Sequence, residues 1–153
     1  MVLYYFTMKK RSFVLAIALV LLASAAFSQD YNSALKTAKK ENKPLLLYFF
    51  SKSCYYCTLM DGKTLADKEI AAVLKKDFVF LRVDVDKSED LGRLYRVSGT
   101  PSSWFLESSG KPVGGMPGYV EPGDYKNILD YVKGRHYKEM DLQAYLKNAS
   151  ARR

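Results

Sequence analysis

The feature that most constrains this chain is the pair Cys54 and Cys57, its only two cysteines, which are separated by Tyr55 and Tyr56. The apolar run 44–50 precedes the pair and a helix-like stretch follows it. Two intervening residues let one turn at a helix start bring both sulfurs together, and the free N–H groups there stabilise a thiolate on the first cysteine. The spacing indicates a reversible disulfide, with Cys54 as the nucleophile and Cys57 as the shielded resolving thiol.

Other uses of this spacing are less well supported. Zinc needs four ligands, but the chain has no second cysteine pair and His136 is its only histidine. Haem attachment needs a histidine directly after the second cysteine, where Thr58 stands. A purely structural disulfide stays open as an alternative, although closing so short a loop removes little chain entropy. We therefore expect redox chemistry, with no metal and no cofactor besides the disulfide itself.

The N-terminus has the three-part pattern of a secretory signal peptide. Basic residues 9–11 precede the apolar run 12–23, and the small residues Ala26 and Ser28 follow it. We predict a signal peptide over 1–28, with Met8 as the true start. An uncleaved anchor is the alternative, but the apolar run is shorter than the roughly 20 residues that span a bilayer. The mature chain is expected to have no stable membrane anchor.

Export places the mature chain in an oxidising compartment such as a bacterial periplasm. About 125 residues then remain, enough for one domain over 29–153 with its own core. Loss of the three basic residues at 9–11 lowers the formal net charge from +8 to +5. The remaining basic residues are dispersed among acidic ones, so the composition gives no support to a nucleic-acid partner.

Helical and strand patterns alternate along the chain. Apolar spacing from Tyr31 to Ala38 predicts a helix before the buried strand 45–50. After the helix that carries the cysteines, residues 61–63 are expected to break the pattern, and Asp67 to cap the next helix.

The second half continues this alternation with further expected elements. They are the strand 78–85, a short helix through Leu91 and Tyr95, antiparallel strands 103–106 and 113–116, a helix opened by residues 121–124, and a C-terminal helical extension over 135–153.

This order of elements and motifs resembles the thioredoxin superfamily over about residues 31–133. The matching features are the CxxC pair at a helix start, the turn 99–101, Gly110 in a hairpin, Gly118 and the closing helix. The chain looks most similar to exported thioredoxin-like proteins, including the SoxW-type thioredoxins and the C-terminal domain of the thiol:disulfide interchange protein. The resemblance implies an α/β thioredoxin fold, a central mixed β-sheet flanked by helices, here with an added C-terminal helix.

The resemblance also implies roles for residues around the disulfide. Pro101 would follow a cis peptide bond beside the cysteines, and Thr100 would offer its backbone to an incoming peptide. An ordinary trans turn is the alternative. Tyr55 and Tyr56 stand between the cysteines, where family members tune their redox potential, and are expected to contact the substrate.

One departure from the family concerns the proton of the second thiol. Thioredoxin has a buried aspartate where this chain has Tyr48, and a lysine where it has Arg82. The group that deprotonates Cys57 is therefore not identified by the resemblance. Water, a tyrosine hydroxyl and the charge of Arg82 are candidates, while apolar burial is the favoured role for Tyr48.

The residues and the resemblance together predict an exported thiol-disulfide oxidoreductase that reduces disulfides in periplasmic proteins. Because that compartment is kept oxidising, a membrane thiol transporter is the expected electron donor. Two alternatives stay open: a disulfide oxidase or isomerase, and a non-catalytic thioredoxin-like module that binds peptides beside Thr100 and Pro101.

Overall fold

The computed structural model describes residues 30–151. The predicted signal peptide 1–28 and the proposed start at Met8 lie outside the described residues. Of the described residues, 34–151 form one compact unit to which residues 30–33 do not belong. A helix covers residues 30–41, which confirms the helix predicted from Tyr31 to Ala38.

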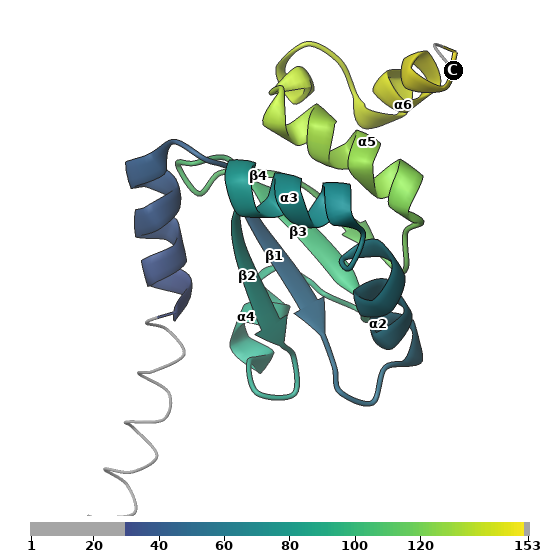
Figure 1. The fold of residues 1–153 in the computed structure, drawn as a ribbon. Coiled ribbons are helices and arrows are strands. Elements are labelled where there is room, and N and C mark those ends of the chain that lie inside the picture. The colour runs from purple at the N-terminus through teal and green to yellow at the C-terminus, as the bar shows by residue number, and fades with distance from the viewer. Residues whose placement is uncertain (1–29, 152–153) are drawn as a thin grey trace, which may run out of the picture. The chain divides into compact units, whose positions relative to one another are not determined.

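A mixed sheet of four strands forms the centre of the compact unit (Figure 1). Its strands are β1 (Leu45–Phe50), β2 (Val79–Asp84), β3 (Ser102–Leu106) and β4 (Pro112–Pro117), in the spatial order β2-β1-β3-β4. β1 runs parallel to β2 and antiparallel to β3, and β4 is antiparallel to β3. The predicted strands and the antiparallel hairpin are confirmed. β1 is buried over nearly its whole length, as expected for an apolar run between two strands.

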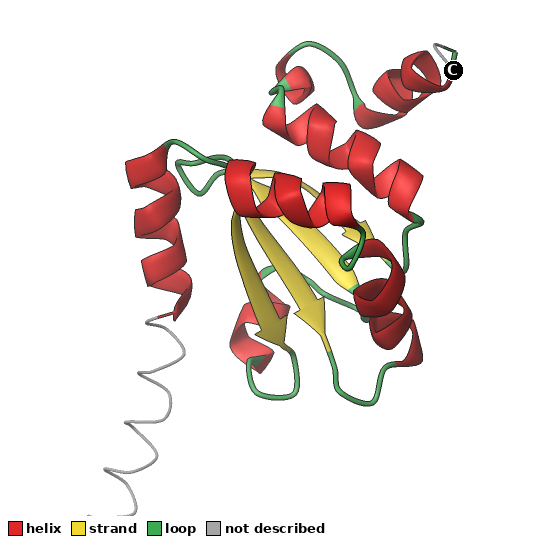
Figure 2. Cartoon of the chain, viewed as in Figure 1, coloured by secondary structure: helices red, strands yellow, loops and turns green. Residues whose placement is uncertain are grey.

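Helices surround this sheet, as Figure 2 shows. They are α2 (Tyr55–Leu59), the π-helix η1 (Met60–Thr64), α3 (Lys68–Asp77), α4 (Glu89–Leu94), α5 (Pro122–Lys133), the 3₁₀ turn η2 (His136–Lys138) and α6 (Leu142–Ser150). The expected cap of α3 is present, since Asp67 accepts hydrogen bonds from the N–H groups of Glu69 and Ile70, both at 3.0 Å. The predicted C-terminal helix is confirmed as α6.

The two faces of the sheet carry different helices because alternate residues of β1 point to opposite faces. Leu46 and Tyr48 join the main core with residues of α3 and α5, including the fully buried Leu129. On the other face, the ring centroids of Phe49 and Tyr95 lie 5.8 Å apart, and Tyr95 is the C-cap residue of α4. Both faces of the sheet are therefore covered.

The predicted break after the cysteine helix is wrong. Residues 61–63 belong to η1, where the N–H of Leu65 donates to the carbonyl of Met60 at 2.8 Å. A π turn takes in one more residue than an α turn while keeping its backbone groups paired. Gly62 is accommodated in this wide turn, so the helical path continues from α2 through η1.

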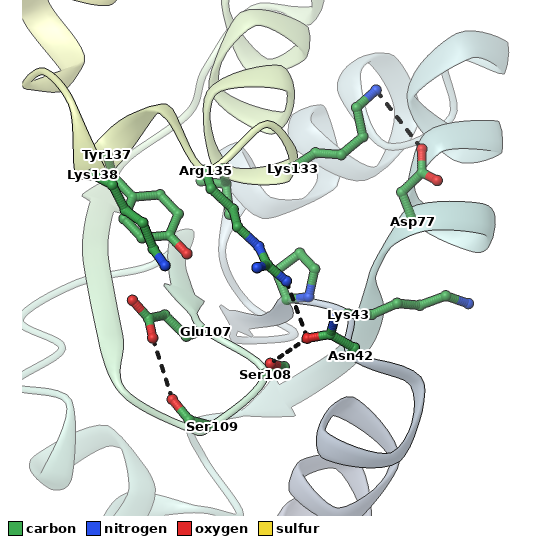
Figure 3. A pocket seen from close by; sticks show the side chains of 12 residues that line it. Asn42, Lys43, Asp77, Glu107, Ser108, Ser109, Lys133, Arg135, Tyr137 and Lys138 are labelled. Atoms are coloured by element: carbon green, nitrogen blue, oxygen red, sulfur yellow. Dashed lines mark hydrogen bonds and ion pairs between the residues drawn. The ribbon is translucent and has the colours of Figure 1, made fainter.

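A polar hollow of about 280 Å³ lies beside the amino end of β1 (Figure 3). In it, Arg135 and Ser108 each donate a hydrogen bond to the side-chain oxygen of Asn42, both at 3.1 Å. The cysteines follow the carboxyl end of the same strand. The hollow therefore lies at the opposite end of β1 from the candidate site.

Candidate redox-active site

The two cysteines form a disulfide at the start of α2. Cys54 is the N-cap residue, with extended backbone angles, and its sulfur accepts a hydrogen bond from the N–H of Cys57 at 3.1 Å. Cys54 is half-buried, whereas Cys57 is only 2% exposed. The more accessible sulfur also receives the backbone hydrogen bond, which favours a thiolate on Cys54 in the reduced form.

The loop before β3 forms the other side of the site. The Thr100–Pro101 peptide bond is cis, as the resemblance implies. The sulfur of Cys54 lies 3.3 Å from the carbonyl oxygen of Thr100. This loop lies far from the cysteines in sequence, yet it places a backbone carbonyl directly beside the reactive sulfur.

Two exposed aromatic rings adjoin the disulfide. Tyr55 is 73% exposed and Tyr56 is 58% exposed. Their rings contact each other edge to face, with centroids 5.5 Å apart. Large apolar surfaces left in water beside a reactive group are suited to contact with a partner. The role of Tyr55 and Tyr56 in substrate binding stays a prediction.

Tyr48 lies beneath the second cysteine. It is fully buried, as predicted, and its hydroxyl donates to the carbonyl of Cys57 at 3.5 Å. Burial is the main cause that raises the pKa of this hydroxyl. The nearby Asp61 carboxylate raises the pKa further, and the charge of Arg82 lowers it. Tyr48 therefore stays protonated and acts as a hydrogen-bond donor.

Asp61 is a candidate that the sequence interpretation missed. Its carboxylate accepts two hydrogen bonds from the guanidinium of Arg82, at 2.8 and 2.7 Å. The same guanidinium lies over the rings of Phe50 and Tyr48, at 4.6 and 5.1 Å from their centroids. The available signal was the spacing of one helical turn between Cys57 and Asp61, but the expected break at 61–63 concealed it.

The mixed sheet has helices on both faces, and the CxxC disulfide lies at the start of a helix beside the Thr100–Pro101 loop. These features define a class of proteins, those with the thioredoxin fold. The family model for the thioredoxin-like domain matches residues 31–133. The chain therefore belongs to the thioredoxin-like domain family.

Two curated relatives illustrate this membership. Spermatogenesis-associated protein 20 of Homo sapiens is 31% identical over 100 residues, which are 60% of this chain but only 12% of that protein's length. The disulfide bond reductase DsbH of Chlamydia pneumoniae is 27% identical over 117 residues, which cover 69% of each chain. The first relative is thus much longer than the domain that it shares with this chain.

Solved structures agree on the fold. A thioredoxin from Thermus thermophilus is 32% identical, with a TM-score of 0.61 over 67% of this chain and 82% of its own. The oxidised C-terminal domain of DsbD from Neisseria meningitidis has a TM-score of 0.60 over 71% of this chain and 95% of its own. At 23% identity, this second likeness concerns the fold alone.

The structure thus brings Cys54, Cys57, Thr100 and Pro101 together, with Tyr55 and Tyr56 at the edge of the site. Their individual roles in catalysis and binding stay predictions. Within residues 30–151, no helix combines the length and apolar character needed to cross a membrane.

Proposed function

We propose that this chain is an exported thiol-disulfide oxidoreductase that reduces disulfides in periplasmic proteins. The observation that carries the proposal is the position of the half-exposed Cys54 sulfur, 3.1 Å from the N–H of Cys57 and 3.3 Å from the Thr100 carbonyl. The first contact favours the attacking thiolate. The second sets a backbone acceptor where an extended client peptide can pair with it.

The reaction proceeds by two exchanges. The Cys54 thiolate attacks one sulfur of a client disulfide, forms a mixed disulfide and releases the other client sulfur as a thiolate. Cys57 then loses its proton and attacks Cys54, which releases the second client thiolate and forms the disulfide seen in the structure. The client gains two electrons and the Cys54–Cys57 pair loses them.

The reducing direction requires an electron supply. A periplasm is kept oxidising, so the oxidised pair must be reduced again by a donor that carries electrons across the membrane. A membrane thiol transporter supplies this in the proposal. The likeness to a relative named as a disulfide bond reductase supports the same direction.

Replacing Cys57 with Ala is expected to trap clients. With the resolving thiol absent, Cys54 still attacks but the mixed disulfide cannot be released from within the chain. Non-reducing gels of periplasmic extract incubated with the reduced variant should show higher-mass adducts that vanish on reduction.

Mass spectrometry of the trapped species should locate the linkage at Cys54. The matched control is the double variant Cys54→Ser, Cys57→Ala, which should form no adducts. If the single variant also forms none while partners still associate without a covalent bond, the chain is a peptide-binding module instead.

A further inference from the structure

Resolution of the mixed disulfide requires a group that accepts the proton of the Cys57 thiol. A thiol attacks a disulfide as its thiolate, and apolar surroundings disfavour that charged form. Cys57 is only 2% exposed, so bulk water has little access to it. Under the proposed function, this thiol must pass its proton to a neighbouring group each time a client is released.

Most titratable and charged groups around this turn of helix are unable to accept a proton. Tyr48 on β1 keeps its own proton because burial raises its pKa, and burial raises the pKa of Tyr125 on α5 in the same way. Arg82 on β2 and Lys63 on η1 are cations without an acceptor atom. Asp61 on η1 is the remaining group of this set, and it has two carboxylate oxygens.

The position of Asp61 fits this task. It follows Cys57 by four residues, about one helical turn, so the two side chains share a face. Side chains on a helix lean toward its N-terminus, which tilts the carboxylate back toward the turn that holds Cys57. Arg82, which binds this carboxylate, lies over the ring of Tyr48, and the Tyr48 hydroxyl donates to the Cys57 carbonyl. These contacts place the carboxylate in the same neighbourhood as Cys57.

Arg82 fixes this carboxylate by two parallel hydrogen bonds, a geometry that restrains rotation of both groups. The guanidinium is itself held over the rings of Phe50 and Tyr48. The Asp61 side chain is 37% exposed. The carboxylate is therefore partly open to water, to which a proton can leave.

We propose that Asp61 accepts the proton of Cys57 when this thiol resolves a mixed disulfide, and that Arg82 is the positioning residue for that carboxylate. The proton passes from the Cys57 sulfur to Asp61 as the sulfur electron pair forms the bond to Cys54. The bond between Cys54 and the client breaks, and the client thiolate takes a proton from Asp61 or from water. The inference rests on the proposed dithiol function and adds its proton acceptor.

Quenched-flow kinetics with oxidised glutathione separate the two exchanges. Reduced protein is mixed with excess oxidised glutathione and quenched in acid, and intact mass then counts the glutathione adduct and the internal disulfide. Asp61→Asn should slow conversion of the adduct by roughly 100-fold or more, within the range for a lost general base, while adduct formation changes by less than about twofold. The remaining rate should rise steeply with pH, because only direct ionisation of Cys57 supports it.

Three further variants sharpen the test. Asp61→Glu should recover most of the conversion rate, and Arg82→Lys should lower it severalfold without slowing adduct formation. Asp86→Asn is the matched control, since its carboxylate accepts a hydrogen bond from Ser51 at 2.7 Å in the loop before the cysteines. It should leave both steps unchanged.

Conversion that is equally fast in Asp61→Asn and in the unaltered chain would overturn the assignment of Asp61. Equal slowing of both steps, or the same slowing in Asp86→Asn, would overturn it too, because the effect would then be structural or a general charge effect. Failure of the unaltered chain to form the internal disulfide at all would instead refute the proposed function. If Asp61→Asn does not fold, the Asp61→Glu and Arg82→Lys results decide.

Discussion

Replacing Cys54 with Ser is expected to reduce disulfide-reductase turnover to the uncatalysed background. A serine hydroxyl stays protonated at neutral pH and lacks the nucleophilicity of a thiolate, so the first exchange cannot begin. The loss should be roughly 10³-fold or more, as for removal of other enzyme nucleophiles. The turbidity of insulin during reduction by dithiothreitol, with and without the protein, measures it.

The fold should survive this change, because Cys54 is a half-buried cap residue outside the main core. Circular dichroism checks this. The remaining Cys57 should resist alkylation in the folded variant and react after denaturation, since it is 2% exposed. Substantial turnover in a folded Cys54→Ser variant would contradict the role of Cys54 as nucleophile.

Replacing Tyr125 with Ala is expected to have the largest effect on stability. Tyr125 is fully buried on α5 against the sheet, and its hydroxyl pairs with that of Ser103 on β3 at 3.0 Å. Truncating a buried aromatic ring costs about 3–5 kcal/mol of unfolding free energy. The substitution also leaves the buried Ser103 hydroxyl without this partner, which adds about 1–3 kcal/mol. Urea unfolding followed by circular dichroism measures the change.

The matched variant Tyr125→Phe separates the ring from the hydroxyl. It retains the packing and loses the hydrogen bond, so it should cost only about 1–3 kcal/mol. Similar losses in the two variants would mean that the hydrogen bond, and not the buried ring, dominates at this position.

The parts predicted from sequence are those set by local pattern. The apolar run of β1, the CxxC spacing and the capping residue Asp67 are local signals, and each appears where the sequence placed it. The approach of Thr100 to Cys54 joins distant segments, so spacing alone does not reveal it. It was anticipated only through the resemblance.

The misjudged region is the turn after the cysteines. Gly62 between Asp61 and Lys63 is typical of a helix end, but η1 continues the helix because its backbone groups find partners in a wider turn. Asp61, which lies in this turn, is bound by Arg82 from the distant strand β2. The proposed proton acceptor was missed because the expected break concealed its one-turn spacing from Cys57, and because its contact with Arg82 joins segments that are far apart in the sequence.

The most direct test of the central claim is the equilibrium reduction potential of the Cys54–Cys57 pair. Protein without the predicted signal peptide is equilibrated in defined thiol buffers, and free thiols are counted by alkylation and mass. The account predicts a value near that of thioredoxin, roughly −270 mV, which suits a reductase supplied by a membrane donor. A value of roughly −120 to −180 mV would contradict it and assign the protein to disulfide formation or isomerisation.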